Sequence, residues 1–225
     1  WMNDPHGLIQ FQGKFHLFYQ HNPFSGKCGK MHWGHAISKD LIYWEHQPEA
    51  LAPSENYDDW EGGGIFTGSA IEHQDELILF YTGCTKDRQM QCMASSSDGL
   101  IFSKSEQNPV IAEPPPEINP HDFRDPKVWK QSDVWYMVTG VSTLKNHFAT
   151  AEDDQLRSQG KVCLHSSPNL KNWEEILAIT QPDTWSAASM FQALNLDGVD
   201  DMERVLWRTA MHCTDAAKRR RDAEV

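Results

Sequence analysis

The feature that most constrains this chain of 225 residues is a pattern of strands that occurs three times. In each copy a strand ends at a turn that begins with Ser and contains Asp or Asn, and an aromatic residue then starts the next strand. The turns begin at Ser38, Ser96 and Ser166, which are 58 and 70 residues apart. Two further strands precede each turn, and helical periodicity is almost absent. Antiparallel four-strand units at such intervals are typical of β-propeller blades.

The repeat predicts an all-β fold, a five-bladed propeller of which about three and a half blades are present. We expect first strands near residues 1–11, 65–72 and 123–129, and aromatic-rich second strands at 14–21, 76–83 and 134–140. A fourth copy begins at 189–196 and continues at 204–210. Residues 1–210 are therefore predicted to be a partial propeller, and 211–225 a polar tail. We expect the chain to be a fragment whose N-terminus has been cut away and which carries no signal peptide.

The charge of the chain argues against two classes of partner. Its formal net charge is −12, with 32 acidic residues against 20 Lys and Arg, which argues against nucleic acids and anionic membranes. No apolar run approaches the ~20 residues of a membrane span. The five cysteines show no CxxC spacing, so single buried thiols are expected, although Cys84 and Cys92 can face each other across a hairpin. Compartment and oligomeric state stay open.

Two acids occupy matching positions in the first and third copies. Asp4 lies thirteen residues before Leu17 of the aromatic strand, and Asp125 lies twelve residues before Met137. In the second copy, Gly68 takes this place. Such positions fall on the innermost strands of successive blades, whose ends line one central funnel. The repeat therefore predicts that both carboxylates reach a common pocket, although 121 residues separate them.

Each acid taken alone has a simpler explanation. Asn-Asp-Pro around Asp4 is a good turn initiator in any protein, and Arg-Asp-Pro around Asp125 suits a surface ion pair followed by a kink. The shared register favours the functional interpretation. Two carboxylates that converge on one site are the arrangement required for glycoside hydrolysis.

Several motifs together give the chain a resemblance to a known family. WMNDPHG, FYQHNPF, MHWGHAISKDLIYWEH, GGGIFTGSA, FYTG and FRDPKVW resemble glycoside hydrolase family 32, the invertases, fructan hydrolases and sucrose-6-phosphate hydrolases. The similarity covers about residues 1–179. It implies a five-bladed propeller followed by a β-sandwich, which we expect to be absent from this chain, and cleavage of β-fructofuranosyl bonds with retention.

The resemblance also assigns roles to particular residues. Asp4 is implied to be the nucleophile that forms a fructosyl-enzyme, and Asp125 the group that stabilises the transition state by holding fructose hydroxyls. We expect the neighbouring Arg124 to keep Asp125 ionised. The remaining substrate-binding residues that the resemblance implies are Asn3, Gln20, Phe66, Thr67 and Arg124. Trp1, Trp33 and Trp60 fit sugar stacking and core packing equally well, and His32 and His35 are expected to make hydrogen bonds. Neither a metal nor a cofactor is expected.

The chain departs from the family pattern at the proton donor. The family has a glutamate in a segment that leads the fourth blade, whereas this chain has WSAASMFQ at residues 185–192. Depending on the register, Ser186 or Gln192 takes the place of the glutamate, and neither is a general acid near neutral pH. Two smaller departures are Cys28, where the family has Trp, and His6, where it favours Asn.

The leading hypothesis is a retaining β-fructofuranosidase-type hydrolase that acts on sucrose or fructo-oligosaccharides. The alternative is a catalytically impaired, carbohydrate-binding propeller that keeps the pocket but lacks the general acid. A third class, an arabinan- or xylan-cleaving propeller enzyme, agrees less well with WMNDP, FYQHNP and FRDP. The sequence does not determine whether the substrate is sucrose or phosphorylated sucrose. It also does not determine whether the fructosyl unit is transferred to water or to another sugar.

Overall fold

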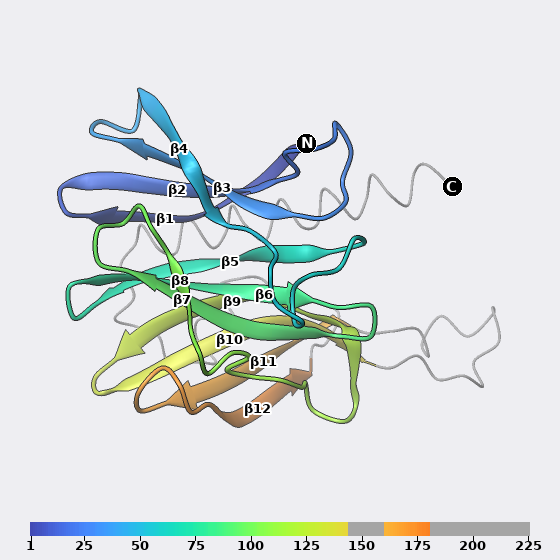
Figure 1. The fold of residues 1–225 in the computed structure, drawn as a ribbon. Helices are drawn as coiled ribbons and strands as arrows, with labels where there is room; N and C mark the ends of the chain where they lie inside the picture. The colour runs from blue at the N-terminus through green and yellow to red at the C-terminus, as the bar shows by residue number, and fades with distance from the viewer. Residues whose placement is uncertain (144–159, 181–225) are drawn as a thin grey trace. The chain divides into compact units, whose positions relative to one another are not determined.

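The computed structural model describes residues 1–143 and 160–180, and in these residues the regular structure is entirely β (Figure 1). The strands form three antiparallel sheets of four strands each, and in every sheet neighbours in sequence are neighbours in space. The strands of the first sheet are β1 Met2–Phe11, β2 Lys14–His21, β3 His32–Ser38 and β4 Trp44–Leu51. Those of the second are β5 Gly64–His73, β6 Glu76–Cys84, β7 Gln89–Ser96 and β8 Ser103–Lys104. Those of the third are β9 Ile118–Gln131, β10 Val134–Thr143, β11 Gly160–Ser167 and β12 Glu174–Thr180.

The three sheets are the blades that the repeat predicts. Figure 1 shows them one after another, from β1–β4 through β5–β8 to β9–β12. The first strand of each sheet contacts the first strand of the next, β1 against β5 and β5 against β9. This contact between leading strands is the arrangement of a propeller around its axis. The partial propeller is confirmed for the described residues, whereas the predicted fourth copy and the polar tail lie outside them.

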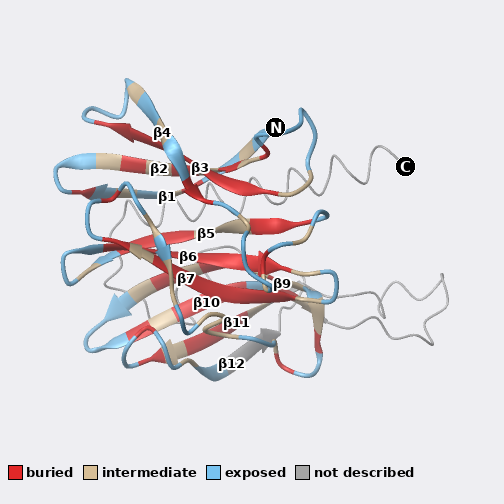
Figure 2. Cartoon of the chain, in the orientation of Figure 1, coloured by how far each residue is buried: buried red, intermediate tan, exposed pale blue. Residues whose placement is uncertain are grey.

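The second sheet is buried on both faces, as the red colour of β6 and β7 in Figure 2 shows. Side chains of a strand alternate between its two faces. From β6, Leu77, Leu79 and Tyr81 pack in a core with Phe18 of the first sheet. The alternate residue Phe80 packs with Val128 and Met137 of the third sheet. A strand covered on both sides needs apolar residues at successive positions, which explains the run ELILFY.

The Ser-x-Asp turns are built as predicted, with one change of landmark. Asp40 Oδ1 accepts the N–H groups of Ile42 and Tyr43, each at 2.9 Å. In the third copy, Asn169 Oδ1 accepts two N–H groups in the same way. The Ser that accompanies Asn169 is Ser167, whose hydroxyl oxygen accepts the Asn169 N–H at 3.2 Å. Ser166 was therefore the wrong landmark, since the two-residue spacing of the other turns is kept by Ser167.

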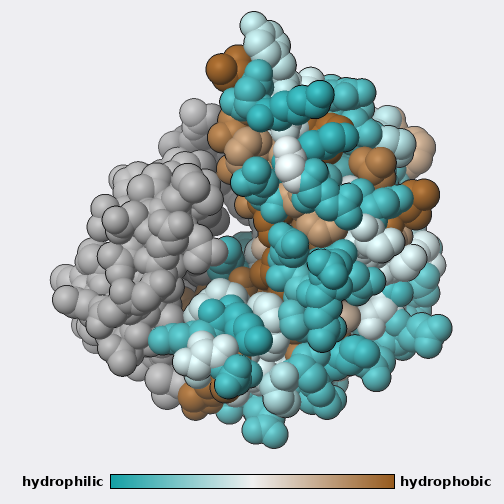
Figure 3. Space-filling model, turned by 90° about the vertical axis from the view of Figure 1, so that its left-hand side faces the viewer, coloured by the Kyte–Doolittle hydropathy of each residue, from teal (hydrophilic) through white to brown (hydrophobic). Residues whose placement is uncertain are grey.

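The surface agrees with the acidic composition. Figure 3 shows a face on which hydrophilic residues predominate and hydrophobic ones are scattered. Several exposed apolar side chains belong to the turns, such as Ile42 at 73% exposure and Ile101 at 76%. The described residues contain no helix of the length and apolarity that a membrane crossing requires. Cys84 and Cys92 are both buried thiols, and Cys84 lies opposite Gln89, so the hairpin alternative for a bridge is wrong.

Candidate active site

Each leading strand is interrupted by a β-bulge at the same height. In β1 the pairing with β2 shifts between Asn3 and Pro5, so Asp4 is the extra residue. In β5 the shift lies between Phe66 and Gly68, and in β9 it lies between residues 124 and 127. The bulged positions are therefore Asp4 and Thr67, and in β9 we assign the bulge to Asp125, whose φ is 62°. A bulge re-aims a side chain away from the alternation of the strand, and bulges are frequent next to active sites.

The residue of the second sheet that matches the two acids is Thr67, which corrects the expected match with Gly68. A side chain at Gly68 is excluded, because a Cβ there would lie 1.9 Å from the carbonyl oxygen of Phe80. Gly68 thus allows β5 to approach β6 closely, and the preceding residue takes the bulge. The Thr67 hydroxyl donates a hydrogen bond of 3.5 Å to Asp4 Oδ2, which is at the long end for such a bond.

Both acids have left-handed backbone conformations, with φ of 39° at Asp4 and 62° at Asp125. Such conformations are uncommon outside glycine, and they cluster at functional sites. The Asp4 side chain is exposed, whereas that of Asp125 is partly buried. Burial raises the pKa of Asp125 to about 6, with the Arg124 charge opposing this rise and the Asp4 charge adding to it. The two carboxylates are thus close enough to act on each other.

The charge of Arg124 acts on the pKa of Asp125 with the expected sign, but burial outweighs it. Its positive charge lowers the pKa of Asp125, yet burial is the larger influence and the net shift is upward. The Arg124 guanidinium is engaged by other groups, since Nη1 donates to Asp122 Oδ1 at 2.7 Å and to Gln89 Oε1 at 3.3 Å. Asp122 is itself held by Ser142, whose hydroxyl donates to Asp122 Oδ2 at 2.7 Å. The guanidinium therefore has a fixed orientation beside Asp125.

The other implied sugar-binding residues border the bulges of β1 and β5. Asn3 Oδ1 accepts a hydrogen bond of 2.7 Å from Trp1 Nε1. Gln20 is 3% exposed, and its Nε2 donates to the carbonyl of Ile65 at 3.1 Å, which joins the first sheet to the second. Phe66 is partly exposed, beside the bulge of β5. Asn3 pairs with Gln20 next to Asp4, and Phe66 precedes Thr67, whose hydroxyl contacts Asp4. The role of these residues toward a sugar stays a prediction.

The aromatic candidates divide between core and surface. Trp33 is fully buried and donates from Nε1 to the carbonyl of Phe66 at 3.0 Å, so it belongs to the core. Trp1 is 48% exposed, and its amino group donates to the carbonyl of Asn22 at 3.0 Å.

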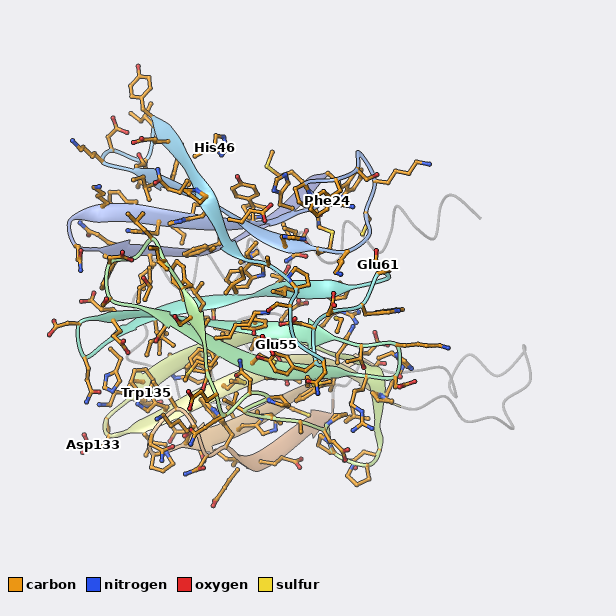
Figure 4. All side chains as sticks on the ribbon, in the orientation of Figure 1. Phe24, His46, Glu55, Glu61, Asp133 and Trp135 are labelled. Atoms are coloured by element: carbon orange, nitrogen blue, oxygen red, sulfur yellow. The ribbon has the colours of Figure 1, made fainter. Side chains whose placement is uncertain are left out.

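Figure 4 shows Phe24 and Glu61, from the β2–β3 and β4–β5 connections, at the end of the sheets where the chain begins. These two connections border the end of β1 that carries Asp4.

The histidines of the first sheet make hydrogen bonds. His32 Nδ1 lies 2.8 Å from Glu49 Oε2, and His16 Nδ1 lies 3.0 Å from His35 Nε2. Within residues 1–143 and 160–180, no cluster of three or more His, Cys, Asp or Glu has an arrangement suited to a metal ion. The positions proposed for the general acid, Ser186 and Gln192, lie outside the described residues.

The sequence did not single out His6 as part of the site. Its ring is buried, and its Nδ1 lies 2.7 Å from the carbonyl oxygen of Asp4. A carbonyl only accepts, so Nδ1 carries the proton and donates a hydrogen bond to the Asp4 carbonyl in the bulge. The ring lies edge-on to Trp33 at 4.1 Å between centroids, and burial lowers the pKa of His6 to about 4. A neutral imidazole therefore supports the backbone of Asp4; its place two residues after Asp4 was the available signal.

Comparison with known proteins agrees with this geometry. Residues 1–222 match the family model "Glycosyl hydrolases family 32 N-terminal domain". The chain is 44% identical over 181 residues to a sucrose-6-phosphate hydrolase of Zymomonas mobilis, covering 77% of this chain and 33% of that protein. It is 42% identical over 189 residues to a raffinose invertase of Escherichia coli, covering 79% and 36%.

A solved structure extends the comparison to the fold. The chain superimposes on the GH32 β-fructofuranosidase of Bombyx mori with a TM-score of 0.68 and 42% identity, covering 81% of this chain and 36% of that one. The chain thus spans about a third of the length of the relatives that it matches. Since the family model covers nearly every residue, this chain belongs to glycosyl hydrolase family 32, within the N-terminal domain of that family.

Proposed function

We propose that the chain carries the nucleophile-bearing part of a retaining β-fructofuranosidase. In this proposal Asp4 attacks the anomeric carbon of a fructosyl unit, and Asp125 stabilises the transition state. The observation that carries it is the pair of acids on matching bulges of β1 and β9, with the charge of Asp4 acting on Asp125. Family membership alone does not fix these roles, because sites rather than folds determine function.

The chemistry follows from the different surroundings of the two acids. The exposed carboxylate of Asp4 forms a bond to the fructosyl carbon as the glycosidic C–O bond breaks, and water later hydrolyses the resulting ester. Positive charge develops on the sugar between these two bonds. Asp125, partly buried beside Asp4, is suited to hold fructose hydroxyls with hydrogen bonds that strengthen as this charge develops.

The names of the relatives support sucrose or a fructan as substrate. Similar proteins are named sucrose-6-phosphate hydrolase, raffinose invertase and, in Bacillus subtilis, levanase. Two solved relatives, from Bombyx mori and Cichorium intybus, are described in complex with sucrose and with 1-kestose. All of these substrates share a fructofuranosyl unit, which is the part that Asp4 would attack.

One observation favours a second candidate, a carbohydrate-binding propeller with impaired catalysis. The sequence places Ser186 or Gln192 where the family has its proton-donating glutamate. A general acid contributes about 10²- to 10⁴-fold to the rate. Its absence leaves the sugar pocket in place while slowing departure of the leaving oxygen.

Fructose release and fructose binding, measured side by side, separate the two candidates. The hydrolase should release fructose from sucrose or 1-kestose, and calorimetry should detect fructose binding. Binding without turnover would favour the impaired propeller, and release of a pentose from arabinan or xylan instead would contradict both. An active Asp4→Asn variant would refute the assignment of the nucleophile.

A further inference from the structure

Three buried side chains of the second sheet hold the backbone that carries Asp125. Gln89 Oε1 accepts the N–H of Phe123 at 3.0 Å, and Gln91 Nε2 donates to the carbonyl of Phe123 at 2.7 Å. Thr82 Oγ1 accepts the N–H of Asp125 itself at 3.2 Å. Thr82 and Gln91 are 0% exposed, and Gln89 is 7% exposed. The bulge in β9 is therefore held by side chains of β6 and β7.

The donors and acceptors of this cluster fit together in one arrangement. The Thr82 hydroxyl lies 3.0 Å from Gln91 Oε1, and an amide oxygen only accepts, so the hydroxyl donates its proton there. The lone pairs of Thr82 are then available to the N–H of Asp125. The amide nitrogen of Gln91 points at the carbonyl of Phe123, which fixes the orientation of the amide group. A buried network in which each member is satisfied rigidifies what it holds.

Asp125 needs such support because its backbone is strained. A non-glycine residue with φ of 62° has an unfavourable backbone conformation, which persists only where its surroundings determine it. We propose that Thr82 and Gln91 are positioning residues for the reaction: they hold Asp125 in its bulge so that its carboxylate meets the sugar beside Asp4. This inference rests on the proposed function and adds two residues of the second sheet to the site.

A second hydrogen bond from the second sheet to β9 provides a matched control. Ser69 of β5 is 5% exposed, and its hydroxyl oxygen accepts the N–H of Val128 at 3.1 Å. This contact also joins the second sheet to β9, but it lies three residues beyond Asp125. Removing the Ser69 hydroxyl takes one buried acceptor from β9 without touching the bulge. A role in stability alone predicts similar effects at both sites, whereas a positioning role predicts a difference in activity.

The test compares Thr82→Val, Thr82→Ser and Ser69→Ala in the full-length protein. Thr82→Val keeps the shape and removes the hydroxyl, so kcat/KM should fall about 10- to 100-fold, because a displacement of about 1 Å can lower a rate ~10²-fold. Thr82→Ser should recover the activity to within about threefold. Ser69→Ala should stay within about twofold while lowering Tm about as much as Thr82→Val. A Tm scan of each variant shows whether it is folded.

Fructose affinity by calorimetry provides a readout that does not need turnover. Thr82→Val should weaken fructose binding about tenfold, and Ser69→Ala should leave it unchanged. If the wild type binds fructose but hydrolyses neither sucrose nor 1-kestose, the proposed hydrolase fails and the affinities alone decide the positioning role. Equal losses for Thr82→Val and Ser69→Ala would overturn that role, as would failure of Thr82→Ser to recover activity. A wild type that neither binds nor hydrolyses these sugars would refute both proposals.

Discussion

The strand that carries Asp4 and the strand that carries Asp125 bend in the same way but present their acids to different surroundings. Both acids stand on a bulge with a left-handed backbone. The carboxylate of Asp4 is exposed, and its backbone carbonyl accepts a hydrogen bond from His6 of its own strand. Asp125 is partly buried, and its backbone N–H donates to Thr82 of another sheet.

Under the proposed function, this difference lets one repeated bulge serve two chemical roles. An attacking carboxylate must reach a carbon atom of the substrate, so exposure suits Asp4. A stabilising carboxylate acts more strongly where water is excluded, because charges interact more strongly in a medium of low dielectric constant. The bulge determines where each acid is, and the neighbouring sheet determines how much water surrounds it.

Asp4→Asn should cause the largest loss of activity. The amide keeps the size of the side chain but cannot form the fructosyl ester, so kcat for sucrose should fall by roughly 10⁴-fold or more. Because the side chain is exposed, Tm should change little. Initial rates of fructose release at saturating sucrose are the measurement. A variant that keeps a tenth of the wild-type kcat would remove Asp4 from the mechanism.

Asp125→Asn should lower kcat/KM by about 10²- to 10³-fold, the range for loss of one electrostatic stabiliser. The wild type should also lose activity in acid. Since the pKa of Asp125 is about 6, kcat/KM should fall about tenfold per pH unit below that value. The pH–rate profile of the variant should lack this limb. An acid limb that is unchanged in Asp125→Asn would assign it to another group.

The same substitution should stabilise the protein near neutral pH. The pKa of Asp125 is about 6 in the folded protein and has a reference value of 3.8, so the folded state binds the proton more tightly. Ionisation therefore opposes folding, fully above pH 6 and not at all below pH 3.8. Asp125→Asn should raise Tm at pH 7.5 by a few degrees, and this gain should vanish near pH 4. An equal gain at both pH values would point to packing rather than charge.

His6→Phe should have a smaller effect that is directed at Asp4. The phenyl ring can keep the contact with Trp33 but cannot donate to the Asp4 carbonyl. Loss of one hydrogen-bond donor corresponds to about 1 kcal/mol, so kcat/KM should fall about 5- to 10-fold. His6→Gln, which keeps an N–H donor, is the control and should recover part of the loss. Identical kinetics for the two variants would limit His6 to a packing role.

Much of the fold could be predicted because buried positions produce a periodic pattern of apolar residues in the sequence. The strand predicted at residues 14–21 is β2 itself, and that predicted at 76–83 is β6 without its last residue. The Ser-x-Asp turns could be predicted equally well, because Asp40 and Asp98 accept backbone N–H groups that only a short polar side chain can reach. The register of each segment was harder to predict, because a shift by one residue leaves the composition of a segment unchanged. The predictions for Ser166 and Gly68 were each wrong by one residue.

The supporting residues of the site could not be predicted in the same way. Thr82 and Gln91 lie within largely buried strands, and their proposed function depends on hydrogen bonds to a strand more than 30 residues further along. A sequence repeat gives the order of strands but not which side chain reaches the neighbouring sheet. Likewise, the pKa of Asp125 depends on the balance between burial and the Arg124 charge, and only the charge is visible in the sequence.

Substitution of Thr67 should have the smallest effect on activity. Thr67 occupies the bulge of the second sheet, where the first and third sheets have Asp4 and Asp125, and it carries no carboxylate. Its hydroxyl donates to Asp4 Oδ2 at 3.5 Å in a partly exposed setting, so this bond contributes little. Thr67→Val should lower kcat by less than about threefold, within the range of a weak hydrogen bond. Thr67→Ser, which keeps the hydroxyl, should match the wild type. A tenfold rise in KM for Thr67→Val with full recovery in Thr67→Ser would instead mean that this hydroxyl binds the sugar, the role that the family resemblance implies for it. All three bulges would then contact the substrate, and exposure alone would no longer distinguish Asp4 from its counterparts.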